Sequence, residues 1–244
     1  MAFNFSPKIV TDGLLLCLDA ANTKSYIGSG TTWIDLSRSS NSGTLVNGPT
    51  FSSNNRGYIT CDGTVDYISI PNTSQFKFGG GNFTVEYWFR KLNTTIGYDD
   101  IWGPNTWNTG ASPGTNEWTL TIGNTTVGNG NNFSLAVEVG TTVYSTGEST
   151  TLLSLNTWYQ LVGVREGGNL KVYLNSELNM SVSPVGFTSS SVINNIPARE
   201  IRINNSGWDR LYTKADNSQL RIYNKALSAT EVLQNYNATK TRFI

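Results

Sequence analysis

Hydrophobic and polar residues alternate along much of this 244-residue chain. In the segment 83–91, FTVEYWFRK, Phe83, Val85, Tyr87 and Phe89 fall on one face, and the residues between them fall on the other. A period of two is typical of a strand with one face packed on a core. Further segments with strand character are 14–20, 57–63, 67–70, 117–123, 132–140, 158–166, 169–177, 199–204 and 218–224. The chain is therefore predicted to consist mainly of β-strands.

Short turns rich in Gly, Asn, Ser and Thr separate these segments. The turn at 166–168, Glu-Gly-Gly, is expected to join its two flanking strands into a hairpin. Strands at this spacing indicate a sandwich or jelly roll and not a series of βαβ units. The longest irregular segment is 92–116, and long ordered loops in compact domains are often functional.

One helix is expected near the end of the chain. Ser228 and Glu231 have the spacing of a capping box, in which each side chain bonds the other residue's backbone N–H. Val232, Leu233 and Tyr236 would then share the side of the helix that docks on the sheet.

The charge of the chain is low and balanced. Lys+Arg and Asp+Glu each number 17, and charged residues make up 14% of the sequence. Such a chain has no long-range field for nucleic acid or an anionic membrane, and little charge to oppose self-association. We therefore expect no nucleic-acid partner, and a homo-oligomer or a role within a larger assembly fits. The first residues lack the pattern of a signal peptide, and no apolar run approaches a membrane span.

The sequence contains no histidine, which excludes His-based acid–base catalysis, Ser-His-Asp and Cys-His nucleophiles and His-ligated zinc. Cys17 and Cys61 are too few for a four-thiolate metal site and lie in strand-like runs. Small buried thiols are the favoured interpretation, and the sequence leaves open whether the two are paired. A retaining glycosidase needs two carboxylates about 5 Å apart. Glu86 and Glu138 each lack an acidic residue two positions away, so an enzyme is not expected.

Five segments carry a resemblance to a known family. They are 12–51, with Trp33-Ile-Asp-Leu-Ser inside it, 57–71, 82–90, 156–178 and 218–243. Together they resemble concanavalin A-like, laminin-G-like (LamG-type) jelly-roll domains of the kind found in virion structural proteins of tailed, cyanophage-like phages. Local departures are Cys61 in place of an aromatic residue, Ser176 in place of Gly, and Asp-Asn-Ser-Gln at 216–219. The resemblance implies an all-β, two-sheet antiparallel jelly-roll sandwich with one short C-terminal helix, as a single domain over residues 1–244.

Two aromatic segments are candidates for ligand binding. Sugars are held by aromatic faces together with planar polar side chains. The segments 98–107 and 207–212 supply this chemistry through Tyr98, Trp102, Asn105, Trp107, Trp208, Arg210 and Tyr212. Aromatic residues in loops are otherwise buried beneath the loop or used in protein contacts. All three interpretations remain open at this point.

Acidic residues in turns are candidates for calcium, which prefers clustered carboxylate and carbonyl oxygens at loop tips. The candidates are Asp99, Asp100, Asp62, Asp66, Asp209 and Asp216. The alternative is that these residues only form turns or face solvent.

The sequence thus predicts a binding or structural module. The first hypothesis is a virion structural protein of a tailed phage: a capsid decoration, fibre or tail-associated adhesion subunit, made in the host cytoplasm. Its partners would be other virion proteins, with host-surface glycans as a second class. The alternative is a calcium-assisted, lectin-like carbohydrate-binding module, and a glycan hydrolase is the least favoured.

Overall fold

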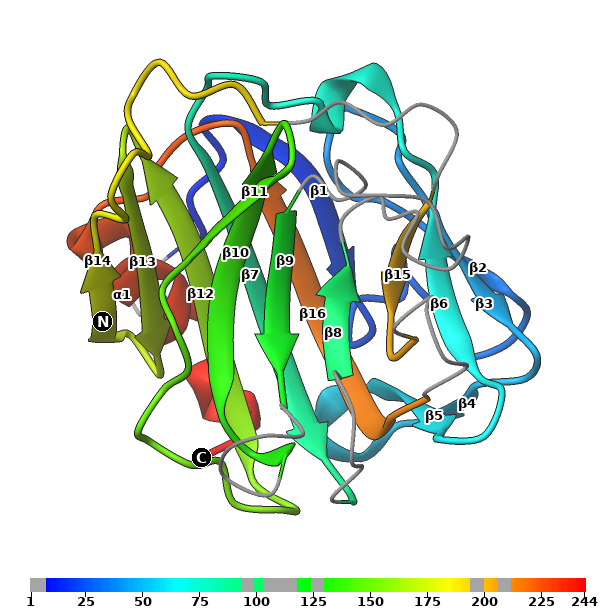
Figure 1. Cartoon of the computed structure of the whole chain (residues 1–244). Coiled ribbons are helices and arrows are strands. Elements are labelled where there is room, and N and C mark those ends of the chain that lie inside the picture. Colours follow the sequence, from blue (N-terminus) through cyan, green and yellow to red (C-terminus); the bar gives the residue numbers. More distant parts are fainter. Residues whose placement is uncertain (1–7, 94–98, 103–117, 124–129, 194–199, 206–211) are drawn as a thin grey trace, which may run out of the picture.

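The computed structural model describes residues 8–93, 99–102, 118–123, 130–193, 200–205 and 212–244. Two antiparallel eight-stranded sheets lie face to face, and one helix lies near the C-terminal end of the chain (Figure 1). The predicted two-sheet sandwich with a short terminal helix is confirmed.

The first sheet, sheet A, contains the hairpin predicted at 166–168. Its strands, in spatial order, are β14 (Glu177–Val182), β13 (Asn169–Leu174), β12 (Trp158–Glu166), β7 (Phe83–Lys91), β16 (Lys214–Tyr223), β5 (Tyr58–Asp62) and β4 (Thr50–Ser52). β1 (Leu14–Asp19) pairs with the second half of β16, whereas β5 pairs with its first half.

The second sheet, sheet B, faces sheet A across the core. Its strands, in spatial order, are β11 (Thr142–Ser145), β10 (Phe133–Val139), β9 (Trp118–Ile122), β8 (Asp99–Trp102), β15 (Ile201–Ile203), β6 (Tyr67–Ile70), β3 (Gly43–Val46) and β2 (Thr32–Trp33). Short 3-10 turns occupy Asn54–Arg56, Ser74–Phe76 and Lys240–Arg242.

The inward residues of both sheets form one core. The four predicted core residues of β7 all belong to it, and each is at most 2% exposed. The sheets approach closely at Gly163 of β12. A Cβ atom there would lie 3.0 Å from methyl carbons of both Leu120 and Leu135. Gly163 therefore leaves room for the two leucines of sheet B, which a larger residue would displace.

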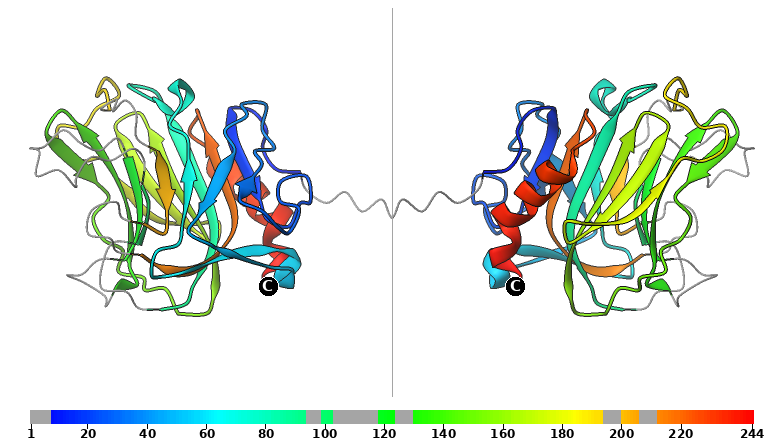
Figure 2. Two further views of the ribbon diagram at one scale, coloured as in Figure 1. Left: turned by 90° about the vertical axis from the view of Figure 1, so that its right-hand side faces the viewer. Right: turned by 90° about the vertical axis from the view of Figure 1, so that its left-hand side faces the viewer.

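Helix α1 (Ala229–Thr239) covers the outer face of sheet A, on the side away from sheet B (Figure 2). The predicted capping box is present, with both of its reciprocal bonds between Ser228 and Glu231. The docking face is partly different from the prediction. Val232 is buried, but Leu233 is 45% exposed, and the polar Asn235 is fully buried instead.

Because the helix lies there, β7 is buried on both faces and not on one. Thr84, Glu86 and Trp88 of its second face are each at most 1% exposed. Alternation identified the strand correctly, but it does not show that a distant helix covers the polar face.

The segment 92–116 is not irregular throughout, because β8 occupies Asp99–Trp102. The prediction for the last strand was also too short: β16 begins at Lys214, not at residue 218. β2, β3, β4, β11 and β14 were not predicted, since they are short or largely polar and show little alternation. Cys17 and Cys61 are buried and free, as favoured, and burial raises the pKa of both thiols.

Candidate functional site

The outer face of sheet B presents a compact polar and aromatic cluster where β6 and β15 pair. Ile68 and Ile70 of β6 and Ile203 of β15 point into the core. Since successive side chains of a strand alternate between faces, Tyr67 and Arg202 point outward. Both strands lie next to each other in sheet B (Figure 1).

These outward side chains hold one another in place. The Arg202 guanidinium carbon lies 4.9 Å from the centre of the Tyr67 ring. Arg202 Nε donates to Glu200 Oε1 at 2.6 Å, and Ser69 Oγ donates to Glu200 Oε2 at 2.6 Å. Arg202 Nη1 donates to Asn205 Oδ1 at 3.2 Å. The guanidinium is therefore fixed on one side by an aromatic face and on the other by a carboxylate and an amide.

We call Tyr67, Ser69, Glu200, Arg202 and Tyr212 the Arg202 surface. The side chains of Arg202 and Glu200 are 31% and 33% exposed, so a ligand can reach them. Burial raises the pKa of the Tyr67 hydroxyl, the charge of Glu200 raises it further, and the charge of Arg202 opposes them. Tyr67 is therefore neutral at physiological pH and can both donate and accept a hydrogen bond.

Two of the seven candidate ligand-binding residues are described: Tyr212 belongs to this surface, and Trp102 lies next to it in β8. The backbone of Trp102 in β8 pairs with Arg202, and Tyr212 pairs with Asn205 in an isolated bridge. One described residue of each aromatic segment thus pairs with a residue in or just after β15, and a role of either in ligand binding stays a prediction. The remaining candidates lie outside the described residues: Tyr98, Asn105, Trp107, Trp208 and Arg210.

Sequence analysis missed the other residues of the surface. Tyr67, Ser69, Glu200 and Arg202 lie in segments that were predicted as strands, and alternation alone would have placed Arg202 and Tyr67 outward. The missing information was the pairing of β6 with β15, which are more than 120 residues apart in sequence.

Where the structure describes their side chains, the acidic candidates for calcium do not form one cluster. Asp99 and Asp100 belong to strand β8 and not to a loop tip. Asp216 lies inside β16 and not before it; it is 2% exposed and accepts from Arg90 at 2.6 Å and from Thr60 at 2.6 Å. Its position was misjudged because the acidic start of β16 resembles a turn.

Asp62 and Asp66 do lie together, since the Asp62 backbone N–H donates to Asp66 Oδ2 at 3.3 Å. Backbone N–H groups, of Thr64 first, lower the pKa of Asp62, whereas burial raises that of Asp66. Asp209 lies outside the described residues. Within the described part of the chain, no three acidic or cysteine side chains converge as metal ligands would. Calcium binding stays a prediction.

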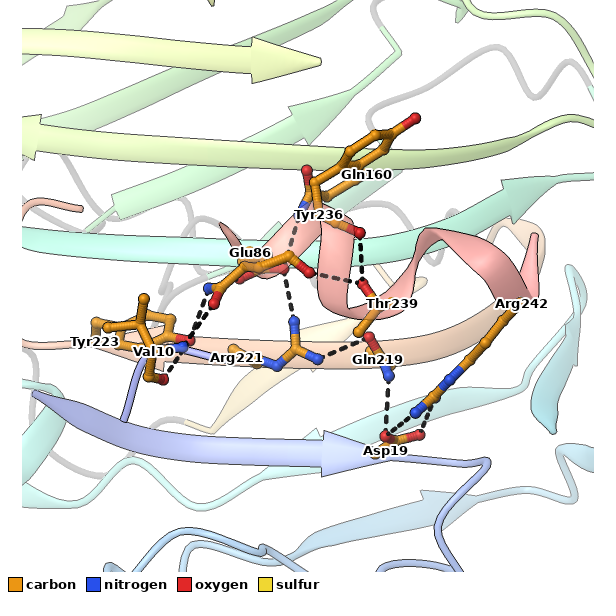
Figure 3. Close-up of polar contacts among 11 residues, drawn as sticks. Val10, Asp19, Glu86, Gln160, Gln219, Arg221, Tyr223, Tyr236, Thr239 and Arg242 are labelled. Carbon is orange, nitrogen blue, oxygen red and sulfur yellow. Dashed lines mark hydrogen bonds and ion pairs between the residues drawn. The ribbon is translucent and has the colours of Figure 1, made fainter. Parts of the chain in front are cut away.

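A second polar cluster lies beneath α1, on the outer face of sheet A (Figure 3). Glu86 accepts from Arg221 at 2.6 Å, from Gln160 at 2.8 Å and from Asn235 of the helix at 2.6 Å. The Glu86 and Arg221 side chains are 1% and 2% exposed. No ligand can reach this cluster without removal of the helix, so its role is to fasten α1 to the sheet.

The network continues to the end of the chain. Gln219 accepts from Arg221 at 2.9 Å and donates to Asp19 at 2.9 Å, and Arg242 donates to both oxygens of Asp19 at 2.7 and 2.9 Å (Figure 3). Phe243 then stacks on Trp88, with ring centres 4.3 Å apart. Phe243 also contacts the Trp158 ring, with centres 4.8 Å apart, and Asn55 donates to the Arg242 carbonyl oxygen at 2.9 Å. The segment after α1 is therefore held by an ion pair, a hydrogen bond and aromatic contacts.

Comparison with known proteins agrees with the fold. A family model, Laminin_G_3, described as the concanavalin A-like lectin/glucanases superfamily, matches residues 62–233. Among proteins of curated function, none matches the sequence. In the described residues, no helix is long and apolar enough to cross a membrane.

Several solved structures have a similar fold. The binding domain of Paraclostridial Mosquitocidal Protein 1 has a TM-score of 0.69 and 15% identity, over 93% of this chain and 52% of that chain. The botulinum neurotoxin serotype D ligand binding domain, in complex with N-acetylneuraminic acid, has a TM-score of 0.66 and 14% identity, over 93% and 51%. The binding domain of botulinum neurotoxin DC, in complex with SialylT, has a TM-score of 0.66 and 12% identity, over 94% and 52%. The present chain thus spans about half the length of each.

Proposed function

Because the chain belongs to the Laminin_G_3 family of the concanavalin A-like lectin/glucanases superfamily, we propose that it is a non-enzymatic, lectin-like module that binds a glycan on the Arg202 surface. Similar structures include binding domains solved with N-acetylneuraminic acid and with SialylT. Those ligands belong to domains twice as long as the matched part, so the support they give is for the class of ligand and not for the position of the site.

The observation that carries the proposal is the prearranged group of Arg202, Glu200, Ser69 and Tyr67. A sugar hydroxyl needs fixed donors and acceptors, and its ring carbons need an apolar surface. The Arg202–Glu200 pair supplies both a donor and an acceptor, and the rings of Tyr67 and Tyr212 supply apolar area beside them. Since the pair is already oriented by 2.6 Å contacts, binding would cost little side-chain entropy.

Chemistry on the bound glycan is not part of the proposal. Retaining glycosidases use two carboxylates about 5 Å apart, one of them free to attack or to donate a proton. Glu200 is the carboxylate within the Arg202 surface, and both of its oxygens already accept hydrogen bonds, from Arg202 and Ser69. It is therefore better suited to hold a hydroxyl than to react.

The first test is a glycan array followed by titration of the best ligand. We expect the Arg202→Gln and Tyr67→Ala variants to bind about 10- to 100-fold more weakly, because hydrogen bonds to charged groups contribute about 1.5–3 kcal/mol. Arg56→Gln is the matched control, since Arg56 is exposed on a 3-10 turn away from this surface. Binding by none of the glycans, or undiminished binding by Arg202→Gln, would contradict the proposal. Repeating the array with EDTA tests the calcium-assisted alternative, which requires binding to be lost.

The biological setting that we propose is an adhesion subunit on the virion of a tailed phage, as a capsid decoration, fibre or tail-associated protein. The support is the resemblance of the segments 12–51 and 218–243 and the balanced charge of the chain. We expect antibodies against the protein to label purified phage particles in electron micrographs. Absence of the protein from such particles, by mass spectrometry, would refute the setting and leave the glycan-binding proposal standing.

A further inference from the structure

The segment Trp33-Ile-Asp-Leu-Ser, which contributes to the family resemblance, forms a loop after β2 that several hydrogen bonds hold in place. Asp35 is 7% exposed and accepts from the backbone N–H groups of Cys17 at 2.8 Å, Ser37 at 2.8 Å and Asn41 at 2.9 Å. Ser37 Oγ also donates to Asp35 Oδ2, at 2.7 Å. One buried carboxylate thus organises the whole loop.

The same loop is fastened to strand β1. Ser37 Oγ and Asn41 Nδ2 both lie within hydrogen-bonding distance of the Leu15 carbonyl oxygen, at 3.0 and 3.1 Å. Trp33, at the start of the segment, is fully buried. With Trp33 and Asp35 turned inward, Leu36 and Arg38 are left exposed on the outside. Both side chains are therefore accessible to a ligand.

A surface hollow lies between this loop and the start of β1, with a volume of about 480 Å³. It is lined by Thr11, Asp12, Leu14, Leu36, Ser37 and Arg38. The volume lies within the range of about 300–1,000 Å³ that small-molecule sites occupy. The lining combines two leucine side chains with hydroxyls, one carboxylate and one guanidinium, which is the composition of a site for an amphipathic polar ligand.

The charges in the hollow favour an anion. The Asp12 carboxylate is already paired with Lys225, at 2.9 Å. In the described part of the chain, no carboxylate forms an ion pair with Arg38. A guanidinium binds a carboxylate through two parallel hydrogen bonds, more strongly and more specifically than it binds a neutral oxygen.

We propose that this hollow, the Arg38 hollow, binds a sugar that carries a carboxylate. It would be a subsite for acidic sugars, separate from the Arg202 surface. Arg38 pairs with the sugar's carboxylate, Leu14 and Leu36 contact its apolar face, and the Thr11 hydroxyl bonds a sugar hydroxyl. The proposal rests on the glycan-binding function and adds to it a preference for acidic glycans.

The test is an NMR titration of the full chain with N-acetylneuraminic acid and with its methyl ester, which has no carboxylate charge. We expect the acid to shift the amide signals of Leu36, Ser37 and Arg38 and to bind at least tenfold more tightly than the ester. In Arg38→Gln, affinity for the acid should fall to that for the ester, whereas Arg56→Gln should behave as the unmodified protein.

The variants separate the two proposals. If Arg38→Gln binds the acid undiminished, or the acid and ester bind equally, the Arg38 hollow is refuted. If in addition Arg202→Gln loses affinity for neutral glycans of the array, glycan binding on the Arg202 surface is supported without the Arg38 hollow. If the shifts at 36–38 appear but no variant of the Arg202 surface changes any glycan affinity, the Arg38 hollow is supported and the Arg202 surface is refuted.

Discussion

Glu86→Gln is expected to lower the free energy of unfolding by about 3–5 kcal/mol, because it leaves the Arg221 charge buried without its partner. The two side chains are 1% and 2% exposed and lie 2.6 Å apart. Burial acts to lower the pKa of Arg221, but the surrounding groups, Glu86 first among them, together outweigh burial and hold that pKa above the ordinary value. Arg221 thus stays charged, and the variant cannot relieve the cost by deprotonation. Urea unfolding followed by circular dichroism measures the change.

The chain provides a matched control for this prediction. Glu200 and Arg202 also lie 2.6 Å apart, but their side chains are 33% and 31% exposed. Glu200→Gln should therefore cost no more than about 1 kcal/mol. The double variant Glu86→Leu with Arg221→Met should recover most of the stability, since apolar residues of similar size often replace a buried ion pair without loss. Equal costs for Glu86→Gln and Glu200→Gln would contradict this account of the network.

Trp88→Ala is expected to cost about 3–5 kcal/mol, the usual range for removing a large aromatic side chain from a core. Trp88 is 1% exposed, and its ring stacks on Tyr236 of α1 at 5.6 Å and on Phe243 at 4.3 Å. Its loss removes the surface on which the end of α1 and the following residues pack. Thermal unfolding measures the cost, and limited proteolysis should show faster cleavage after residue 239.

The partner of this stack provides the check. Phe243→Ala alone should cost less, because Phe243 is only partly buried. Residues in contact share interaction energy. The double variant Trp88→Ala, Phe243→Ala should therefore lose less stability than the two single variants together, by at least about 0.5 kcal/mol. Strict additivity would show that Phe243 does not dock on Trp88 in solution.

The fold could be predicted largely from local patterns. β6, β7 and β12 begin and end where alternation placed them, and the capping box located the start of α1. What local patterns do not contain is which residues distant in sequence face each other. Glu86 and Asn235 look like surface residues in their own segments, yet they meet under the helix at 2.6 Å. The docking face of the helix was predicted from apolar periodicity, which favoured Leu233. Periodicity does not reveal that Glu86 of the sheet accepts a hydrogen bond from Asn235, which is why Asn235 is buried instead.

The candidate site could be predicted only in part. Two of the aromatic candidates are described: Trp102 pairs with Arg202, and Tyr212, which pairs with Asn205, belongs to the Arg202 surface. Their role in ligand binding stays a prediction. Arg202 and Tyr67 carry no unusual local signal, because an arginine and a tyrosine on outward strand positions are common. Their contact depends on the register of β6 with β15, which pairs Ser69 with Arg202. The prediction of a calcium ligand at Asp216 was misplaced because Asp216 resembles a turn residue in sequence. In the structure it is buried inside a strand and forms an ion pair with Arg90.

The most direct test of glycan binding on the Arg202 surface is a crystal structure of the protein with the best ligand from the array. The account predicts a sugar residue against Tyr67 and Tyr212, with its hydroxyls bonded to Arg202 and Glu200. A sugar bound elsewhere, with Arg202 and Glu200 still in contact only with each other and their present neighbours, would contradict it.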